Sequence, residues 1–148
     1  MAAAEMLGGR VRVLFLCTHN SARSQMAEGL LRHLTGNRLV AYSAGIEATH
    51  VRPQALRVMG ELGIDISGQE SKTLDRYLGE PFDYVITVCD DAKKACPFFP
   101  SAAQRLHWSL PDPAAAERTE DERLEVFWSV RDRLRDQMEG ELLNGKRG

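Results

Sequence analysis

The sequence predicts an α/β fold: a single domain built on a four-stranded parallel twisted sheet with helices on both faces. The 148 residues suit one domain that is large enough to fold without stabilising disulfides or metal ions. The sequence contains no internal repeat and no low-complexity linker. Short apolar segments alternate with helical patterns, which favours parallel strands joined by crossover helices. The polar positions Cys17, Cys89 and Asp112 each follow a predicted strand.

The first strand and the first helix are the clearest unit. Residues 11–16 are mostly apolar and too short to cross a membrane, which indicates a buried strand. The helix that follows carries its apolar residues on one face: Met26, Ala27, Leu30, Leu31 and Leu34. Thr35-Gly36-Asn37 is typical of a helix end.

The middle of the chain predicts a strand, a helix and a third strand. Residues 39–43 form a short strand closed by Ala44-Gly45. Pro53 suits the first position of a helix, and Gly63 suits its end. Residues 71–78 have room for one or two helical turns. Residues 82–88 (FDYVITV) are rich in β-branched and aromatic side chains, which predicts a strand.

The last third predicts a fourth strand and a long helix. Residues 105–109 (RLHWS) form the strand, and the Pro-Asp-Pro within residues 110–118 requires a loop because proline lacks a backbone donor. Thr119 and Glu122 fit a capping box that starts a helix running to about Leu143. Residues 90–100, with two prolines, form a short helix at most. We expect flexible ends over 1–10 and 144–148 around a domain of residues 11–143.

Composition argues against several classes of function. Acidic residues outnumber basic ones by 21 to 19, so the chain lacks the positive footprint of a nucleic-acid or anionic-membrane binder. The N-terminus lacks the basic start and apolar core of a signal peptide, and no segment has transmembrane length. We therefore expect a cytoplasmic protein, monomeric by default, with neither nucleic acid nor membrane as a partner.

The loop between the first strand and helix predicts a nucleophilic cysteine in an oxyanion site. A helix that begins directly after a strand directs unpaired N–H groups and its positive dipole end into the loop. Cys17 begins this loop and Arg23 ends it, so the thiol should ionise readily and the guanidinium should hold two oxygens of the anion. The expected oxyanion-binding residues are Thr18, His19, Asn20, Ser21, Ala22, Arg23 and Ser24.

Within this loop, we expect Ser24 to hydrogen-bond the thiolate and Asn20 to brace the backbone. The alternative is that Cys17 is a small buried residue at the end of a strand. Cys17, Cys89 and the loop containing Asp112 should meet at one sheet edge, because ligands bind at the carboxyl ends of parallel strands. Asp112 precedes a proline, so a simple turn role is also open for it.

The spacing of Cys89 and Cys96 leaves three interpretations: incidental cysteines, a metal site or a redox pair. Zinc sites have closer ligand pairs and more histidine nearby. The four histidines form no ligand pattern: His19, His33, His50 and His107. We therefore expect no metal.

The chain resembles the thioredoxin-coupled arsenate reductases, a branch of the low-molecular-weight protein tyrosine phosphatase superfamily. The likeness covers nearly all of residues 11–143, and the first loop is its most specific part. It rests on CTHNSARSQMAEGLL from residue 17, YSAG from 42, GIDIS from 63, VITVCDDAKKAC from 85 and HWSLPDP from 107. The pair Cys89 and Cys96 is specific for the reductase branch.

The resemblance implies a reaction that uses all three cysteines. The Cys17 thiolate would attack arsenate, with Asp112 as general acid for the departing oxygen. Cys89 would attack the Cys17–arsenic adduct at sulfur and release arsenite, and Cys96 would then move the disulfide to Cys89–Cys96. Thioredoxin would be the external reductant, although glutaredoxin or a small thiol is not excluded, and no cofactor would be bound. Phosphate and sulfate would mimic arsenate.

Other functions stay open beside arsenical resistance. A low-molecular-weight protein tyrosine phosphatase would act through a phosphoenzyme at Cys17, because phosphate and arsenate share geometry and charge. Gln25 stands where such phosphatases often carry proline, which favours the reductase. A phosphocarrier domain that holds phosphate on cysteine is a third possibility. It would need neither Arg23 nor a general acid, so the presence of both residues counts against it. A cysteine-based redox sensor without turnover is the remaining alternative.

The sequence departs from the family pattern at position 72. The resemblance implies that some relatives use a carboxylate there to hold a potassium ion, with partners matching Asn20, Glu28 and Ser43. Here the residue is Lys72. We therefore expect no cation, with the ammonium in its place.

Overall fold

The computed structural model describes residues 11–36, 38–89, 102–113 and 119–143. The expected flexible ends, Cys96 and the segment around it lie outside these residues. The elements are β1 (Val11–Cys17), α2 (Arg23–Thr35), β2 (Leu39–Gly45), α3 (Pro53–Gly60), the 3-10 turn η1 (Leu74–Tyr77), β3 (Phe82–Thr87), β4 (Ala102–His107), α5 (Glu120–Met138) and the π-helical turn η2 (Glu139–Leu143).

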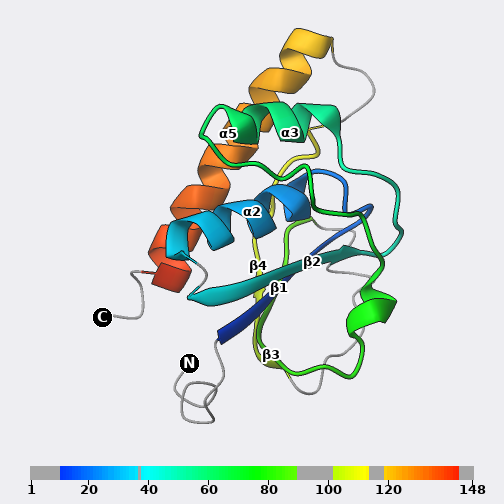
Figure 1. Cartoon of the computed structure of the whole chain (residues 1–148), viewed down its shortest axis with the longest axis vertical. Coiled ribbons are helices and arrows are strands. Elements are labelled where there is room, and N and C mark those ends of the chain that lie inside the picture. Colours follow the sequence, from blue (N-terminus) through cyan, green and yellow to red (C-terminus); the bar gives the residue numbers. More distant parts are fainter. Residues whose placement is uncertain (1–10, 37, 90–101, 114–118, 144–148) are drawn as a thin grey trace.

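The sheet is parallel throughout, in the order β2-β1-β3-β4, which confirms the predicted α/β class. Helices α2, α3 and α5 pack against one another as one layer. The turn η1 packs on β2 and β3 instead, with Tyr77 edge-on to Tyr42 and Phe82. Figure 1 shows β2 between this turn and α2. No helix among the described residues is long and apolar enough to cross a membrane.

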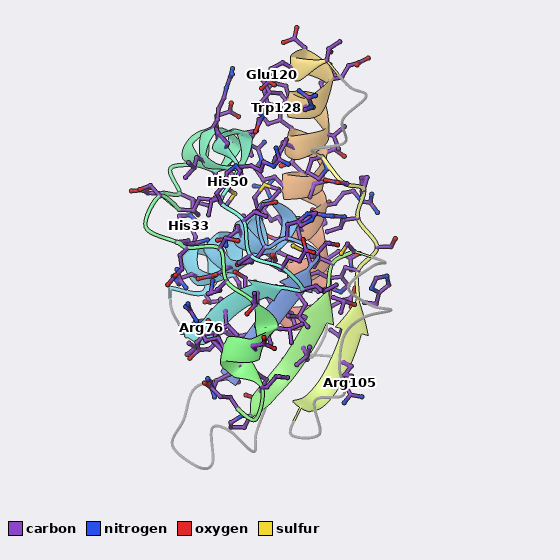
Figure 2. The ribbon with its side chains drawn as sticks, turned by 90° about the vertical axis from the view of Figure 1, so that its right-hand side faces the viewer. His33, His50, Arg76, Arg105, Glu120 and Trp128 are labelled. Carbon is purple, nitrogen blue, oxygen red and sulfur yellow. The ribbon has the colours of Figure 1, made fainter. Side chains whose placement is uncertain are left out.

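The core surrounds β1, one of the two inner strands of the sheet. Val13, Leu14 and Phe15 are completely buried, as expected for a parallel strand covered on both faces. Helix α5 buries one stripe against this core: Leu124, Phe127, Val130, Leu134 and Met138. Its predicted capping box is present, since Thr119 and Glu122 each bind the other's backbone N–H. Figure 2 shows Trp128 on the same helix, and its indole donates to Glu61, one residue beyond α3.

Strand β4 differs from its predicted range of 105–109. It begins at Ala102 and ends at His107 because its pairing with β3 runs from Phe82–Ala102 to Thr87–His107. Local side-chain preference does not select alanine for a strand, so the neighbouring strand sets this boundary. Arg105 lies on β4 (Figure 2).

Helix α3 starts with Pro53 as predicted but ends at Gly60 rather than near Gly63. The N–H groups of Gly63 and Ile64 turn back to Gly60 and Met59, and Gly63 takes a positive φ of 77°. The glycine therefore ends the turn that follows the helix.

The register of the sheet brings four strand ends to one level. Cys17 pairs with Gly45, Leu16 with Thr87, and Thr87 with His107. The loops after β1, β2, β3 and β4 therefore leave the sheet along the same edge, which is the edge expected for the candidate site.

Candidate active site

The loop that joins β1 to α2 is held from outside by its carbonyl groups. The carbonyls of Cys17, Thr18 and Ser21 accept backbone N–H groups of Ile46, Glu47 and Arg52 at 3.2, 2.9 and 2.8 Å. The carbonyl of His19 accepts the Ser71 hydroxyl at 3.0 Å, and that of Asn20 accepts the Gln25 amide at 3.1 Å. Two segments distant in sequence thus fix the loop backbone.

This arrangement directs the loop's N–H groups toward its interior. In a trans peptide the carbonyl and the N–H point in opposite directions, and the described residues contain no cis peptide. The N–H groups of residues 18–22 therefore point away from the segments that hold the carbonyls. They donate to none of the described residues. A row of inward N–H groups at the start of a helix favours a bound oxyanion.

Gly45 allows the loop to approach the end of β2. A Cβ at this position would lie 2.7 Å from the backbone nitrogen of Asn20 and 2.7 Å from the carbonyl oxygen of Glu47. Both neighbours are backbone atoms, so the clash cannot be relieved by rotating a side chain. The glycine is thus needed for the close packing of two chain segments.

The sulfur of Cys17 lies 2.9 Å from the hydroxyl oxygen of Ser24, and both residues are buried. Asn20, also buried, has a positive φ of 50° and donates through Nδ2 to Ser24 at 2.8 Å and to Ser43 at 3.0 Å. Ser24 therefore lies in contact with the sulfur, and Asn20 joins it to Ser43 of β2; their expected roles stay predictions.

Arg23, the first residue of α2, is held from the opposite side by the loop after β4. Its Nη1 donates to the carbonyl of Leu110 at 3.1 Å, and Nη2 lies 4.0 Å from Asp112 Oδ1. The Asp112 side chain is more than half exposed. A carboxyl group beside the guanidinium, in contact with solvent, can exchange a proton with an anion held there.

Cys89 lies at the same edge, just beyond β3. Its Sγ is 3.3 Å from the hydroxyl of Thr18, the residue that follows Cys17. Both Cys17 and Cys89 are thiols outside any disulfide, and both are buried. Leu16 of β1 pairs with Thr87 of β3 across the sheet. Cys17 comes one residue after Leu16 and Cys89 two residues after Thr87, so both cysteines lie at the same end of two neighbouring strands.

Lys72 reaches into the space beside the loop, behind Asn20. Its Nζ lies 3.3 Å from Ser43 Oγ and 3.6 Å from Glu28 Oε1, and it donates to the carbonyl of Glu70 at 2.9 Å. Burial lowers the pKa of Lys72, and the Glu28 carboxylate opposes that shift. The ammonium therefore contacts two of the three side chains that the resemblance associates with a potassium ion.

A thiol, a guanidinium and a row of inward N–H groups thus belong to one loop between β1 and the first residue of α2. Residues 12–144 match the family described as low molecular weight phosphotyrosine protein phosphatase. The chain belongs to this family.

Relatives within the family are named arsenate reductases. One from Halalkalibacterium halodurans is 49% identical over 122 residues, covering 82% of this chain and 88% of that protein. A solved arsenate reductase in the phosphate binding state has a TM-score of 0.77 and 35% identity, covering 88% of this chain and 95% of that one. A thioredoxin-dependent arsenate reductase of Corynebacterium glutamicum has a TM-score of 0.65 and 31% identity, covering 94% and 66%.

The remaining predicted site residues of this phosphatase-family loop differ in their exposure. His19 is half exposed, and its Nε2 lies 3.4 Å from Glu47 Oε1. Ser21 and Ala22 are buried where the loop enters α2. No group of three or more histidine, cysteine or acidic side chains among the described residues is arranged to hold a metal. Figure 2 shows His33 and His50 on different parts of the chain.

Sequence reasoning missed the segments that hold the loop. Ser71, Thr49 and the backbone of residues 46–52 come from outside the strand-loop-helix unit, so no local pattern reveals them. Gly45 carried a usable signal, because a glycine that closes a buried strand often marks a close backbone approach.

Proposed function

We propose that this protein reduces arsenate to arsenite through a relay of three cysteines, with electrons supplied by thioredoxin. The observation that carries the proposal is the position of Cys89, whose sulfur is 3.3 Å from the hydroxyl of Thr18 in the loop that Cys17 begins. A phosphatase of this family needs a single cysteine at the loop, and a second one at its edge gives the first a redox partner. The arsenate reductases among its relatives support this assignment.

The first step is nucleophilic attack. Arsenate binds to the inward N–H groups and Arg23, and the Cys17 thiolate forms a sulfur–arsenic bond while one arsenate oxygen leaves as water. Asp112 supplies a proton to that oxygen. The Ser24 hydroxyl lies 2.9 Å from the sulfur, and a hydrogen bond donated by it would favour the thiolate before attack.

The second step transfers the electrons. The Cys89 thiolate attacks the sulfur of Cys17, so a sulfur–sulfur bond forms while the sulfur–arsenic bond breaks. The bonding pair stays on arsenic, which leaves as arsenite, two electrons more reduced. The cysteines are disulfide-bonded, so electrons balance. Neighbouring parallel strands are about 4.8 Å apart, a spacing compatible with a disulfide between residues at their ends.

The third step regenerates the nucleophile. Cys96 attacks Cys89, which frees the Cys17 thiolate and leaves a Cys89–Cys96 disulfide for thioredoxin to reduce. Cys96 lies outside the described residues, and its role comes from the sequence resemblance. The name of the thioredoxin-dependent relative supports this choice of reductant. We place the reaction in the cytoplasm, carried out by a monomer that confers arsenical resistance without a bound cofactor.

The second candidate is a phosphatase that acts through a phosphoenzyme at Cys17. The observation that favours it is the site itself: the loop, Arg23 and Asp112 would bind phosphate as well as arsenate. Hydrolysis of an aryl phosphate requires neither Cys89 nor Cys96.

One assay separates the two candidates. The protein is mixed with arsenate, thioredoxin, thioredoxin reductase and NADPH, and NADPH loss is followed beside a parallel assay of p-nitrophenyl phosphate hydrolysis. The proposal predicts NADPH oxidation that depends on arsenate and thioredoxin, is lost in Cys89→Ser, and exceeds the rate of ester hydrolysis. Rapid ester hydrolysis without NADPH oxidation would establish the phosphatase instead.

A further inference from the structure

We infer that Gln25 is a positioning residue for the Cys17 nucleophile: its amide orients Asn20, which in turn directs the Ser24 hydroxyl at sulfur. This inference rests on the proposed function, in which Cys17 reacts as a thiolate. Gln25 is the third residue of α2, and its side chain is fully buried. Burying an amide costs free energy unless its polar groups form hydrogen bonds. Every polar atom of its side chain has a partner.

The contacts of Gln25 define the orientation of its amide. Its Nε2 faces three oxygens: the Asn20 carbonyl at 3.1 Å, Asn20 Oδ1 at 2.9 Å and the Glu70 carbonyl at 2.9 Å. Only a donor can occupy a position among three acceptors. On the other side, Oε1 accepts Gln69 Nε2 at 2.7 Å, which also donates to the Gln25 carbonyl. The orientation therefore follows from backbone atoms whose roles are fixed.

Asn20 receives its orientation from Gln25 together with the backbone N–H of Lys72. Gln25 holds both the backbone carbonyl and Oδ1 of Asn20, and the backbone N–H of Lys72 donates to the same Oδ1 at 2.9 Å. With Oδ1 committed to two donors, Nδ2 must face the hydroxyls of Ser24 and Ser43. The same contacts hold Asn20 at its positive φ of 50°.

The direction of the hydrogen bond between Ser24 and Cys17 follows from these contacts. The Ser24 oxygen accepts a hydrogen bond from Asn20 Nδ2 at 2.8 Å, and its own hydroxyl hydrogen can therefore point at Cys17 Sγ at 2.9 Å. A hydroxyl that donates to sulfur favours the thiolate, whereas one that accepts from the thiol favours the neutral form. Gln25 thus acts on Cys17 through two intervening side chains without contacting it.

Charged groups near this path are themselves paired. Arg23 contacts Leu110 and lies 4.0 Å from Asp112, and the Lys72 ammonium is paired with Glu28 beyond Ser43. None of these charged side chains has a recorded contact with the Gln25 amide. A change at Gln25 therefore alters the hydrogen-bond direction while leaving these charges in place.

The test measures how readily Cys17 reacts in full-length variants. Iodoacetamide labelling of Cys17 is followed by peptide mass spectrometry at about pH 6.5 and about pH 9.5, and the ratio of the two rates reports the thiolate fraction. Gln25→Met keeps the side-chain length and removes both N–H donors. Gln25→Glu keeps the shape but replaces the amide with a carboxyl group, so it removes the donors and can add a negative charge, and it serves as the second variant if Gln25→Met folds poorly.

Gln69→Met is the matched control, because it removes amide hydrogen bonds to Gln25 but no contact to Asn20. We expect the labelling ratio to fall roughly tenfold in Gln25→Met and at least as far in Gln25→Glu. In Gln69→Met it should stay within about twofold of the wild type. Urea unfolding of each variant measures the accompanying loss of stability.

Three results would overturn the inference; the first two leave the proposed function standing, and the third removes it as well. A wild-type ratio in both Gln25 variants, with arsenate reduction intact, would show that Gln25 only stabilises the fold. An equal fall in Gln25→Met and Gln69→Met that follows their stability would mean the same. If Cys17 of the wild type is labelled at about pH 6.5 no faster than an ordinary cysteine thiol, it is not the thiolate nucleophile that the proposed function requires. The proposed role of Gln25 is then disproved as well.

Discussion

The hydroxyl oxygen of Ser24 lies 2.9 Å from the sulfur of Cys17 and accepts a hydrogen bond from Asn20, so its proton is available to the sulfur. The pair joins the end of β1 to the first turn of α2 and is buried from solvent. The proposed nucleophile thus lies at the same strand-helix junction as the proposed anion site.

Removing this hydroxyl should slow the first chemical step. In Ser24→Ala, loss of a hydrogen bond to a charged sulfur should reduce kcat at neutral pH by roughly tenfold or more. Raising the pH should recover much of the rate, because the thiolate then forms without help. The measurement is the pH profile of arsenite release, and a rate reduced equally at every pH would argue against a role for Ser24 in ionisation.

Gly45 should tolerate no side chain. In Gly45→Ala the new Cβ meets the backbones of Asn20 and Glu47, so the loop must shift. We expect a stability loss of about 1–3 kcal/mol and a weaker affinity for phosphate, measured by urea unfolding and calorimetric titration. Gly60→Ala is the control, because an added Cβ there meets nothing within 4 Å. Equal phosphate affinities in the two variants would contradict the close approach.

Asp112 should matter for chemistry rather than for binding. In Asp112→Asn the side chain keeps its shape beside Arg23 but cannot donate an acidic proton. We expect kcat for arsenate reduction to fall about 100-fold while the phosphate Kd changes little. Stopped-flow kinetics and titration of phosphate measure the two quantities. A variant with nearly normal kcat would leave Asp112 as a turn residue.

Lys72 and Glu28 form a buried ion pair whose members should depend on each other. Each side chain is less than 10% exposed, and their nearest charged atoms are 3.6 Å apart. Lys72→Met removes the ammonium but leaves the Glu28 carboxylate paired with Arg32 at 2.7 Å, so it should cost about 1–3 kcal/mol in the free energy of unfolding. Adding Glu28→Gln should recover part of that loss, whereas strictly additive losses would show that the charges are not coupled.

Much of the fold could be predicted because its signals are local. The apolar segment of β1, Pro53 at the start of α3 and the pair Thr119 and Glu122 each act within one element. The start of β4 could not be predicted in the same way. Ala102 joins the sheet because it faces Phe82 of β3, a contact that depends on the assembled sheet.

In the candidate site, too, the local contacts could be predicted from the sequence and the contacts between distant segments could not. Cys17, Arg23 and Ser24 belong to one strand-loop-helix unit, so their proximity follows from local geometry. The contact of Gln25 with Glu70 and the approach of Gly45 to Asn20 join segments far apart in sequence. The sequence identifies Gln25 as an amide and Gly45 as a residue without a side chain, but it does not show which distant residues they contact.

The most direct test of the relay is the state of its cysteines after a single turnover without reductant. Reduced protein is mixed with arsenate, quenched with an alkylating agent, and analysed by peptide mass spectrometry beside an arsenite assay. The account predicts about one arsenite per protein, an alkylated Cys17, and a disulfide between Cys89 and Cys96. In Cys96→Ser the disulfide should instead join Cys17 to Cys89. Arsenite released with all three cysteines still reduced, or no arsenite at all, would contradict the relay.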